Sequence, residues 1–263
     1  MITPEQQALI ERIRATLEAD ARVESAWLSG SLGRGEGDTF SDIDVTVVLD
    51  EEDLAPAIAE YGGPKSPLGP SVWKKTLYQR IVSVVTPEWE RYDLSFVTPA
   101  ELRNQGVGGL KPLTAGAKPP PGAATGPRAP RPTRADDLVA AAEEFLRVLG
   151  LAPVMVGRQE WLVGQWGVGL ARNMLIDLMV EANGKSGLRG GVKRLNAFLT
   201  AEQRASLEAL APPAANGEAL LASHLEIARR YVALGRDLLG ETWPSAFEAA
   251  TRAHLQKSLE LTF

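Results

Sequence analysis

The sequence predicts an α+β fold, in which a domain built on a small mixed β-sheet is followed by an α-helical bundle. Three observations predict it. Short runs rich in β-branched residues occur only in residues 1–105, and the apolar pattern becomes helical from residue 135 onward. A stretch rich in proline and glycine, residues 106–134, separates the two patterns. A chain of 263 residues that is 44% hydrophobic can build two small cores, so we expect domains at 1–105 and 135–263 joined by a linker.

The first domain is expected to begin with a helix. Thr3 supplies an N-cap, Pro4 takes the first helical position and Gln6 completes a capping box. The following alternating and apolar runs predict a mixed sheet with its helices on one side. The strands are expected at 23–28, 43–48, 78–85 and 92–97, with a further helix at 51–61.

The linker and the second domain differ in composition. Residues 106–134 contain seven prolines and several basic residues, so this stretch is expected to be extended and unable to bury a core. Its basic residues could alternatively reach a bound anion. Helical periodicity then predicts helices near 135–150, 159–183, 201–210, 217–240 and 244–260.

Composition excludes several classes of function. The net charge of −5 argues against a surface that binds nucleic acid. With no cysteine and only two histidines, disulfides, zinc clusters and thiol catalysis are excluded, and His224 and His254 are expected at the surface. No apolar run has the length of a membrane span and no leader pattern begins the chain, so we expect a cytoplasmic protein without a membrane partner. Whether it is a monomer or a homodimer stays open.

The most informative segment is residues 27–48, where a glycine-rich turn leads into a strand with two carboxylates. Asp42 and Asp44 flank Ile43, and side chains two apart on a strand point the same way. Two carboxylates on one face repel each other unless a cation neutralises them. Magnesium is the natural occupant, since it prefers oxygen ligands and is usually shared with the phosphates of a nucleotide.

The turn before this strand has the composition of a phosphate-binding loop. Gly30 and its neighbouring glycines let the backbone bend closely around an anion, while Ser31 and Ser41 offer hydroxyls and Arg34 offers a fork of donors. We therefore expect the turn to bind phosphate and the strand to bind metal.

The string Gly30-Ser31, Gly35 and Ser41-Asp42-Ile43-Asp44 resembles the signature of the DNA polymerase β-like nucleotidyltransferase superfamily. The resemblance implies a third carboxylate on a neighbouring strand. Asp93 fits this position, because it lies within the apolar run Tyr92 to Val97, where aspartate is otherwise disfavoured. It would either help to hold a second metal ion or act as a general base.

The second domain resembles the C-terminal domain of lincosamide and aminoglycoside nucleotidyltransferases over residues 172–195. In that family the nucleotide and the acceptor lie between the two domains. Lys185 and Lys193 could reach the triphosphate or be solvated helix ends. Glu181 could contact a cationic acceptor, act as a rival base, or be an ordinary surface residue.

The resemblance implies an enzyme that moves a nucleoside monophosphate, usually AMP from ATP with Mg²⁺, to a hydroxyl of a small antibiotic-like molecule and releases pyrophosphate. An aminoglycoside, a lincosamide and an unrelated metabolite remain possible acceptors. Two alternative functions are an enzyme that modifies proteins, as relatives paired with toxins do, and a non-catalytic nucleotide-binding regulator.

Overall fold

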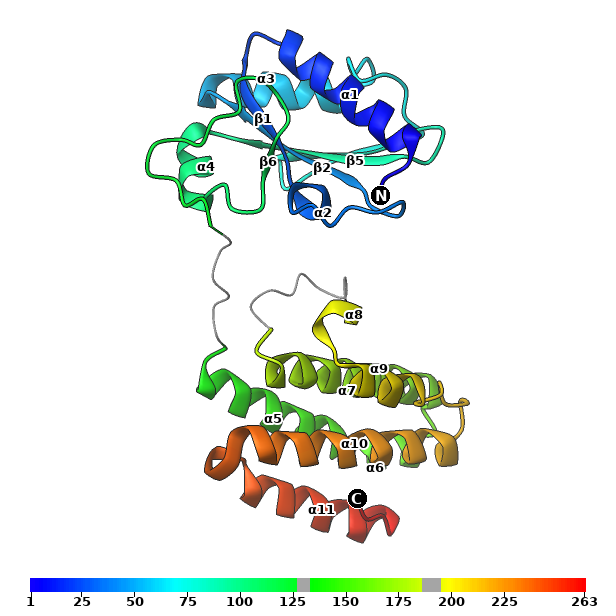
Figure 1. Ribbon diagram of the computed structural model, residues 1–263. Coiled ribbons are helices and arrows are strands. Elements are labelled where there is room, and N and C mark those ends of the chain that lie inside the picture. Colours follow the sequence, from blue (N-terminus) through cyan, green and yellow to red (C-terminus); the bar gives the residue numbers. More distant parts are fainter. Residues whose placement is uncertain (127–132, 186–194) are drawn as a thin grey trace. The chain divides into compact units, whose positions relative to one another are not determined.

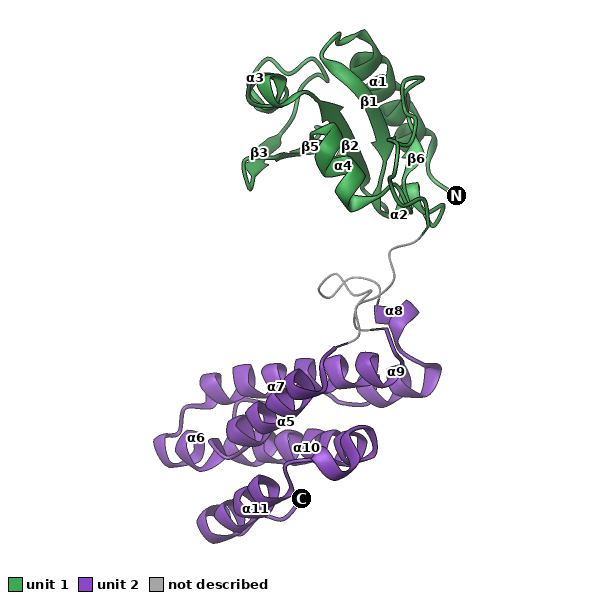
Figure 2. Cartoon of the chain, turned by 90° about the vertical axis from the view of Figure 1, so that its left-hand side faces the viewer, with its two compact units in different colours: residues 1–129 green, residues 130–263 purple. Residues whose placement is uncertain are grey.

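The computed structural model describes residues 1–126, 133–185 and 195–263. The chain forms two compact units, Met1–Ala129 and Pro130–Phe263, each with its own hydrophobic core (Figure 2). The α+β fold class is confirmed, since the first unit holds a mixed sheet and the described part of the second unit is helical. Lys193 lies outside the described residues.

The first unit is built on a six-stranded sheet with the order β3-β4-β5-β2-β1-β6. Its strands are β1 (Val23–Leu28), β2 (Ile43–Leu49), β3 (Trp73–Leu77), β4 (Ile81–Val85), β5 (Arg91–Val97) and β6 (Lys111–Pro112). The central pair, β2 and β5, is parallel, and the other paired neighbours are antiparallel.

Alternation along β2 and β5 separates a core face from a polar one. Ile43, Val45 and Val47 are fully buried in the main core of this unit, together with Leu94 of β5. Ile43 therefore faces the core, as the sequence predicts, and the aspartates next to it in sequence are left half-buried. This alternation decides which face of the sheet carries chemistry.

Helices cover both faces of the sheet, whereas the sequence predicts them on one side only. The helices α1 (Pro4–Ala19) and α3 (Glu51–Gly62) pack on the core face. A shorter helix, α4 (Pro99–Gln105), lies on the opposite side (Figure 1) and packs Leu102 against Trp27 and Val48. The prediction missed α4 because a helix of this length shows too little periodicity, although its N-cap, Thr98, forms a capping box.

The strand predicted at 78–85 begins later than expected, and the strand before it was not predicted. Tyr78 and Gln79 have φ of 49° and 57° and turn the chain between β3 and β4, so only Ile81–Val85 of the predicted run forms a strand. Neither residue type favours this left-handed conformation, so the turn gave no signal in the sequence.

The predicted linker is also wrong over its first half. Lys111 and Pro112 form β6 at the edge of the sheet, pairing with Leu28 and Trp27. Val107 and Ala117 are buried in a small cluster on the same face as α4. A proline can be accommodated there because an edge strand has one side that forms no ladder hydrogen bonds.

The second unit is a helical bundle. Its long helices are α5 (Ala135–Leu149), α7 (Trp161–Ala182), α10 (Gly217–Leu239) and α11 (Ser245–Leu259), close to the predicted ranges. The shorter elements described are α6 (Ala152–Arg158), α8 (Leu195–Phe198), α9 (Ala201–Glu208) and the 3-10 turn η2 (Gly240–Thr242). The helices α7 and α10 pack along much of their length, with Phe145 of α5 stacked on Tyr231 of α10 at 3.7 Å between ring centroids.

Two buried polar side chains mark the bundle core. His224 is buried rather than at the surface, and its burial lowers its pKa. Glu248 is 1% exposed and accepts hydrogen bonds from Arg236, Arg252 and the indole nitrogen of Trp243. This carboxylate therefore ties η2 and α10 to α11. None of the described helices is long and apolar enough to cross a membrane.

Candidate active site

Two of the predicted carboxylates meet across the parallel strand pair. Asp44 of β2 and Asp93 of β5 are direct register partners, and both are half-buried. Ile43 and Leu94 point to the core face, so the two aspartates next to them point to the opposite face. The sheet therefore places two negative charges side by side on its polar face. Asp42, also half-buried, is the residue immediately before β2.

The glycine-rich turn lies directly against one of these carboxylates. Gly30 begins the short helix α2 (Gly30–Gly33) with φ of 56°, and a Cβ atom built on it would lie 1.9 Å from Asp44 Oδ2. No residue with a side chain could take this position without displacing Asp44. The backbone N–H of Ser29 donates to the Asp44 carbonyl at 2.8 Å, which fixes the start of the turn to β2.

The second half of the turn is held by its own hydroxyls. Ser31 Oγ donates to Ser41 Oγ at 3.0 Å, and Ser41 Oγ donates to Asp38 Oδ1 at 3.0 Å. The backbone N–H of Phe40 and the hydroxyl of Ser41 lower the pKa of Asp38. The predicted phosphate-binding residues Gly30, Ser31 and Ser41 thus lie in one loop beside Asp44.

A residue that the sequence analysis did not assign to the site holds this loop in place. Gln6 of α1 is buried, and its amide nitrogen donates to the carbonyls of Asp38, Thr39 and Ser41 at 3.3, 3.4 and 2.8 Å. Its amide oxygen accepts from the Thr3 N–H at 2.7 Å in the predicted capping box. The capping box of Gln6 with Thr3 can be predicted from the sequence, whereas its contacts with the loop at residues 38–41 cannot.

The basic residue of the turn is at the surface. Arg34 is exposed and its Nε donates to Glu36 at 2.8 Å. An exposed ion pair of this kind is weak, so the guanidinium can exchange Glu36 for a phosphate.

A second unpredicted residue contacts the site from β4. Ser83 Oγ donates to Asp93 Oδ1 at 2.6 Å, and Ser83 and Asp93 are register partners in the antiparallel pair β4–β5. Asp93 is therefore flanked by a carboxylate on one side and a hydroxyl on the other.

The predicted site residues of the second unit form local contacts. Lys185 Nζ donates to the Ala197 carbonyl at 3.0 Å, and Glu181 accepts from the hydroxyl of Thr133 at 2.6 Å. Both side chains thus have partners within their own unit.

The donor set on the sheet suits a hard divalent cation. Asp44 and Asp93 supply carboxylate oxygens from paired positions on adjacent strands, and Asp42 is two residues from Asp44. Within residues 1–126, 133–185 and 195–263, no three acidic or histidine side chains stand close enough together to hold a metal ion by themselves. Magnesium commonly takes one or two carboxylates and completes its shell with water and substrate phosphates, which fits this arrangement.

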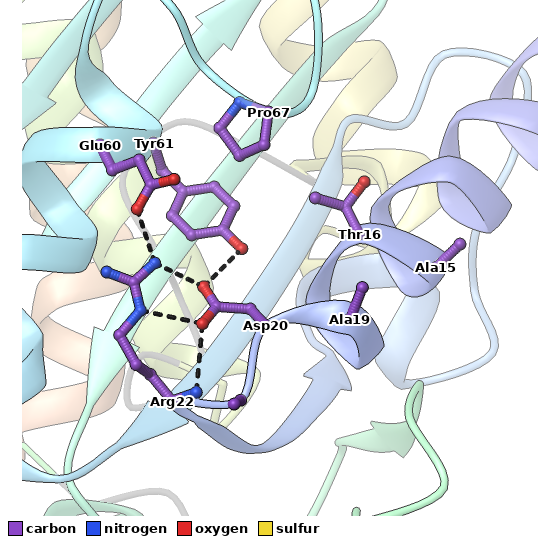
Figure 3. Close-up of a pocket in the computed structure, with 9 residues that line it drawn as sticks. Ala15, Thr16, Ala19, Asp20, Arg22, Glu60, Tyr61 and Pro67 are labelled. Carbon is purple, nitrogen blue, oxygen red and sulfur yellow. Dashed lines mark hydrogen bonds and ion pairs between the residues drawn. The ribbon is translucent and has the colours of Figure 1, made fainter.

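A cavity of about 610 Å³ lies elsewhere in the same unit (Figure 3). It adjoins the turn between α1 and β1, at the end of the sheet where Val23 pairs with Leu49 rather than near Asp44. Arg22 pairs there with Asp20 and Glu60, and Tyr61 donates to Asp20 at 3.1 Å. The hydrogen bond from Arg22 is the main cause that lowers the pKa of Asp20, whereas burial raises that of Tyr61. These polar groups satisfy one another, so the network ties α3 to the start of β1.

Comparison with known proteins supports the interpretation of the sheet domain. Residues 10–102 match the family described as nucleotidyltransferase domain, a range that contains Asp42, Asp44, Asp93 and the glycine-rich turn. No curated protein matches the chain. Among solved structures, an aminoglycoside 6-adenyltransferase from Bacillus subtilis is similar, and the alignment covers 96% of this chain and 98% of that chain. The identity is 14% and the TM-score is 0.43, and both values are too low to indicate a shared acceptor. Residues 10–102 of the first unit are therefore a nucleotidyltransferase domain, and the protein is a nucleotidyltransferase.

Proposed function

We propose that this enzyme transfers a nucleoside monophosphate, AMP from ATP, to a hydroxyl group of a small acceptor and releases pyrophosphate. The observation that carries the proposal is the register pairing of Asp44 with Asp93 on the polar face of the sheet, beside the turn that begins at Gly30. Paired carboxylates next to a glycine-rich loop suit a metal-bound nucleoside triphosphate.

The roles of the residues follow from their positions. Asp42 and Asp44 would hold Mg²⁺, with Asp93 as a further ligand or as the base. When bound, the ion supplies positive charge to the phosphates. Ser31, Ser41 and Arg34 would bind the terminal phosphates, since they lie in the loop that leads into Asp42.

In the reaction, the acceptor oxygen forms a bond to the α-phosphorus while the bond from that phosphorus to the bridging oxygen of the β-phosphate breaks. Asp93 accepts the proton of the hydroxyl or aligns the hydroxyl for in-line attack. The electron pair of the broken bond leaves on pyrophosphate. The main contribution of the protein is positioning, as is general for phosphoryl chemistry.

We propose an aminoglycoside or a lincosamide as the acceptor class. The support is the resemblance of residues 172–195 to the C-terminal domain of lincosamide and aminoglycoside nucleotidyltransferases. The net charge of −5 is compatible with a cationic acceptor. Lys185 and Glu181 remain candidates for contacts with nucleotide and acceptor, and Lys193 stays a candidate from the sequence alone.

The test is pyrophosphate release from ATP and Mg²⁺ with a panel of aminoglycosides, lincosamides and a control without acceptor. The acceptor should gain the mass of AMP. Asp44→Asn should abolish the transfer, as should Asp42→Asn, because each removes a metal ligand, whereas Asp50→Asn should not. Asp50 is a suitable control because it is exposed and directly follows the other end of β2.

Three results would contradict the proposal. Transfer retained by Asp42→Asn or Asp44→Asn would remove the metal assignment. AMP found on a protein instead of a small molecule would favour the protein-modifying alternative. Pyrophosphate release from another nucleoside triphosphate but not from ATP would overturn the choice of nucleotide.

A further inference from the structure

We propose that Ser83 is a positioning residue for Asp93, which extends the active site from β2 and β5 onto β4. The inference rests on the proposed function, in which Asp93 is a metal ligand or the base. Its structural basis is the 2.6 Å hydrogen bond from Ser83 Oγ to Asp93 Oδ1 between two directly paired residues.

The place of Ser83 in β4 indicates that the hydroxyl serves this contact. The strand reads Ile-Val-Ser-Val-Val, and Val82 and Val84 are buried in the core. Ser83 is the only polar residue of the strand, and alternation places it on the face of Asp93. A β-branched apolar residue would suit the strand itself better than serine.

The chemistry of the pair fixes the direction of the bond. A carboxylate can only accept, so the serine hydroxyl must donate. A separation of 2.6 Å is that of a hydrogen bond strengthened by the charge of the acceptor. Ser83 occupies one acceptor site on Oδ1 of Asp93, which leaves Oδ2 and the second lone pair of Oδ1 for a metal ion or an acceptor hydroxyl.

The negative charge of Asp44 explains why Asp93 needs the hydrogen bond from Ser83. Asp44 stands opposite Asp93 on the other side, and like charges at paired positions of a sheet repel. Ser83 lies on the opposite side of Asp93, so its hydrogen bond holds one carboxylate oxygen toward β4 and fixes the side-chain rotamer of Asp93 against this repulsion.

The row of paired residues continues to β3. Lys75 is the register partner of Ser83, and it is exposed. Its neighbours Lys74 and Thr76 face α3, since Lys74 Nζ donates to the Gly63 carbonyl at 2.8 Å and Thr76 Oγ1 lies against Gly62. Lys75 therefore belongs to the polar face, and the row across four strands runs lysine, serine, aspartate, aspartate.

The experiment compares Ser83→Ala, Ser83→Thr and Ser95→Ala in the full chain, measuring AMP transfer with the acceptor found in the panel above. Ser83→Ala should lower kcat roughly 10- to 100-fold, as loss of a supporting hydrogen bond to a ligand commonly does. The KM for ATP should change by less than about twofold, because the groups proposed to bind phosphate are untouched. Ser83→Thr should restore most of the rate, since it keeps the hydroxyl on a residue that suits strands.

Ser95→Ala is the matched control. Ser95 lies two residues beyond Asp93 on the same face of β5, half-buried, and pairs with Thr46 and Ile81 rather than with either aspartate. It should retain the wild-type kcat. Thermal unfolding of all three variants checks that the differences in rate do not come from unfolding.

The outcomes separate this inference from the proposed function. If wild-type protein transfers AMP and Ser83→Ala matches it in kcat, the positioning role is overturned while the proposed function stands. A loss in Ser83→Ala that Ser83→Thr does not repair, or that Ser95→Ala shares, also overturns it. If wild-type protein transfers AMP to no acceptor, the proposed function fails and this inference fails with it.

Discussion

Replacing Gly30 with alanine should disable the site while leaving the domain folded. A Cβ atom at this position would lie 1.9 Å from Oδ2 and 2.8 Å from Cγ of Asp44, where ordinary contacts are longer than 3.4 Å. Either the carboxylate of Asp44 rotates away or the turn moves by more than about 1 Å, and a misplacement of this size can cost about 100-fold in rate. We therefore expect Gly30→Ala to lose AMP transfer by about this factor.

The same substitution carries a second, separable cost. Gly30 has φ of 56°, and holding alanine in the left-handed region costs about 1–2 kcal/mol of folding free energy. With a urea m-value of about 2 kcal/mol/M, the unfolding midpoint of the first unit should fall by about 0.5–1 M. This cost alone would leave nearly all the protein folded under assay conditions.

Gly35→Ala separates the two effects. Gly35 has φ of 73° in the same turn, but a Cβ atom there would meet nothing within 4 Å. It should share the loss of stability and keep the transfer rate. The assay is AMP transfer at saturating ATP and Mg²⁺, with urea unfolding of both variants followed by tryptophan fluorescence. Equal rates for Gly30→Ala and Gly35→Ala would refute the reasoning that the turn must leave Asp44 in place.

Two further predictions concern buried polar side chains. Gln6→Glu keeps the acceptor of the capping box but puts a carboxylate oxygen against the carbonyls of Asp38, Thr39 and Ser41. It should displace that loop and slow AMP transfer about tenfold or more, and a wild-type rate would contradict the anchoring role of Gln6. Glu248→Gln should destabilise the second unit by about 2 kcal/mol at neutral pH. Burial raises the pKa of Glu248, but the hydrogen bonds from its arginine and tryptophan partners outweigh this and hold it below 4.5. The difference in unfolding free energy between wild type and Glu248→Gln should therefore be complete above about pH 4.5, and it should vanish as the pH falls through the lower pKa of Glu248 in the folded state. Urea unfolding of both proteins between about pH 2 and 7 measures this difference. If the two stabilities do not converge at low pH, the ion pairing of Glu248 is weak.

Local sequence signals were sufficient for most elements of the fold. The capping box at Thr3 marks the start of α1, and alternation around Ile43 places the carboxylates beside a core strand. Periodicity gave α5, α7, α9, α10 and α11 within one or two residues at each end. Elements shorter than two helical turns, such as α4 and α6, carry too few residues for a period to be recognised.

The composition of a segment was a poor guide where burial depends on a distant partner. The first half of the proline-rich stretch reads as a linker, yet Val107 and Ala117 are buried because Trp27 and Leu102 provide an apolar surface for them. Likewise, His224 is buried because Gly167 of α7 lies against its ring. The helical period of α10 alone does not show this contact.

The sequence by itself determined the fold class, the glycine-rich turn and the spacing of Asp42 and Asp44, because these depend on residues close together in the chain. Only the tertiary structure decided that Asp93 stands opposite Asp44, that Ser83 holds Asp93, and that Gln6 anchors the loop before Asp42. Each of these contacts joins segments that are 10 to 49 residues apart, and their meeting depends on strand order and register, which are set by the packing of the whole sheet.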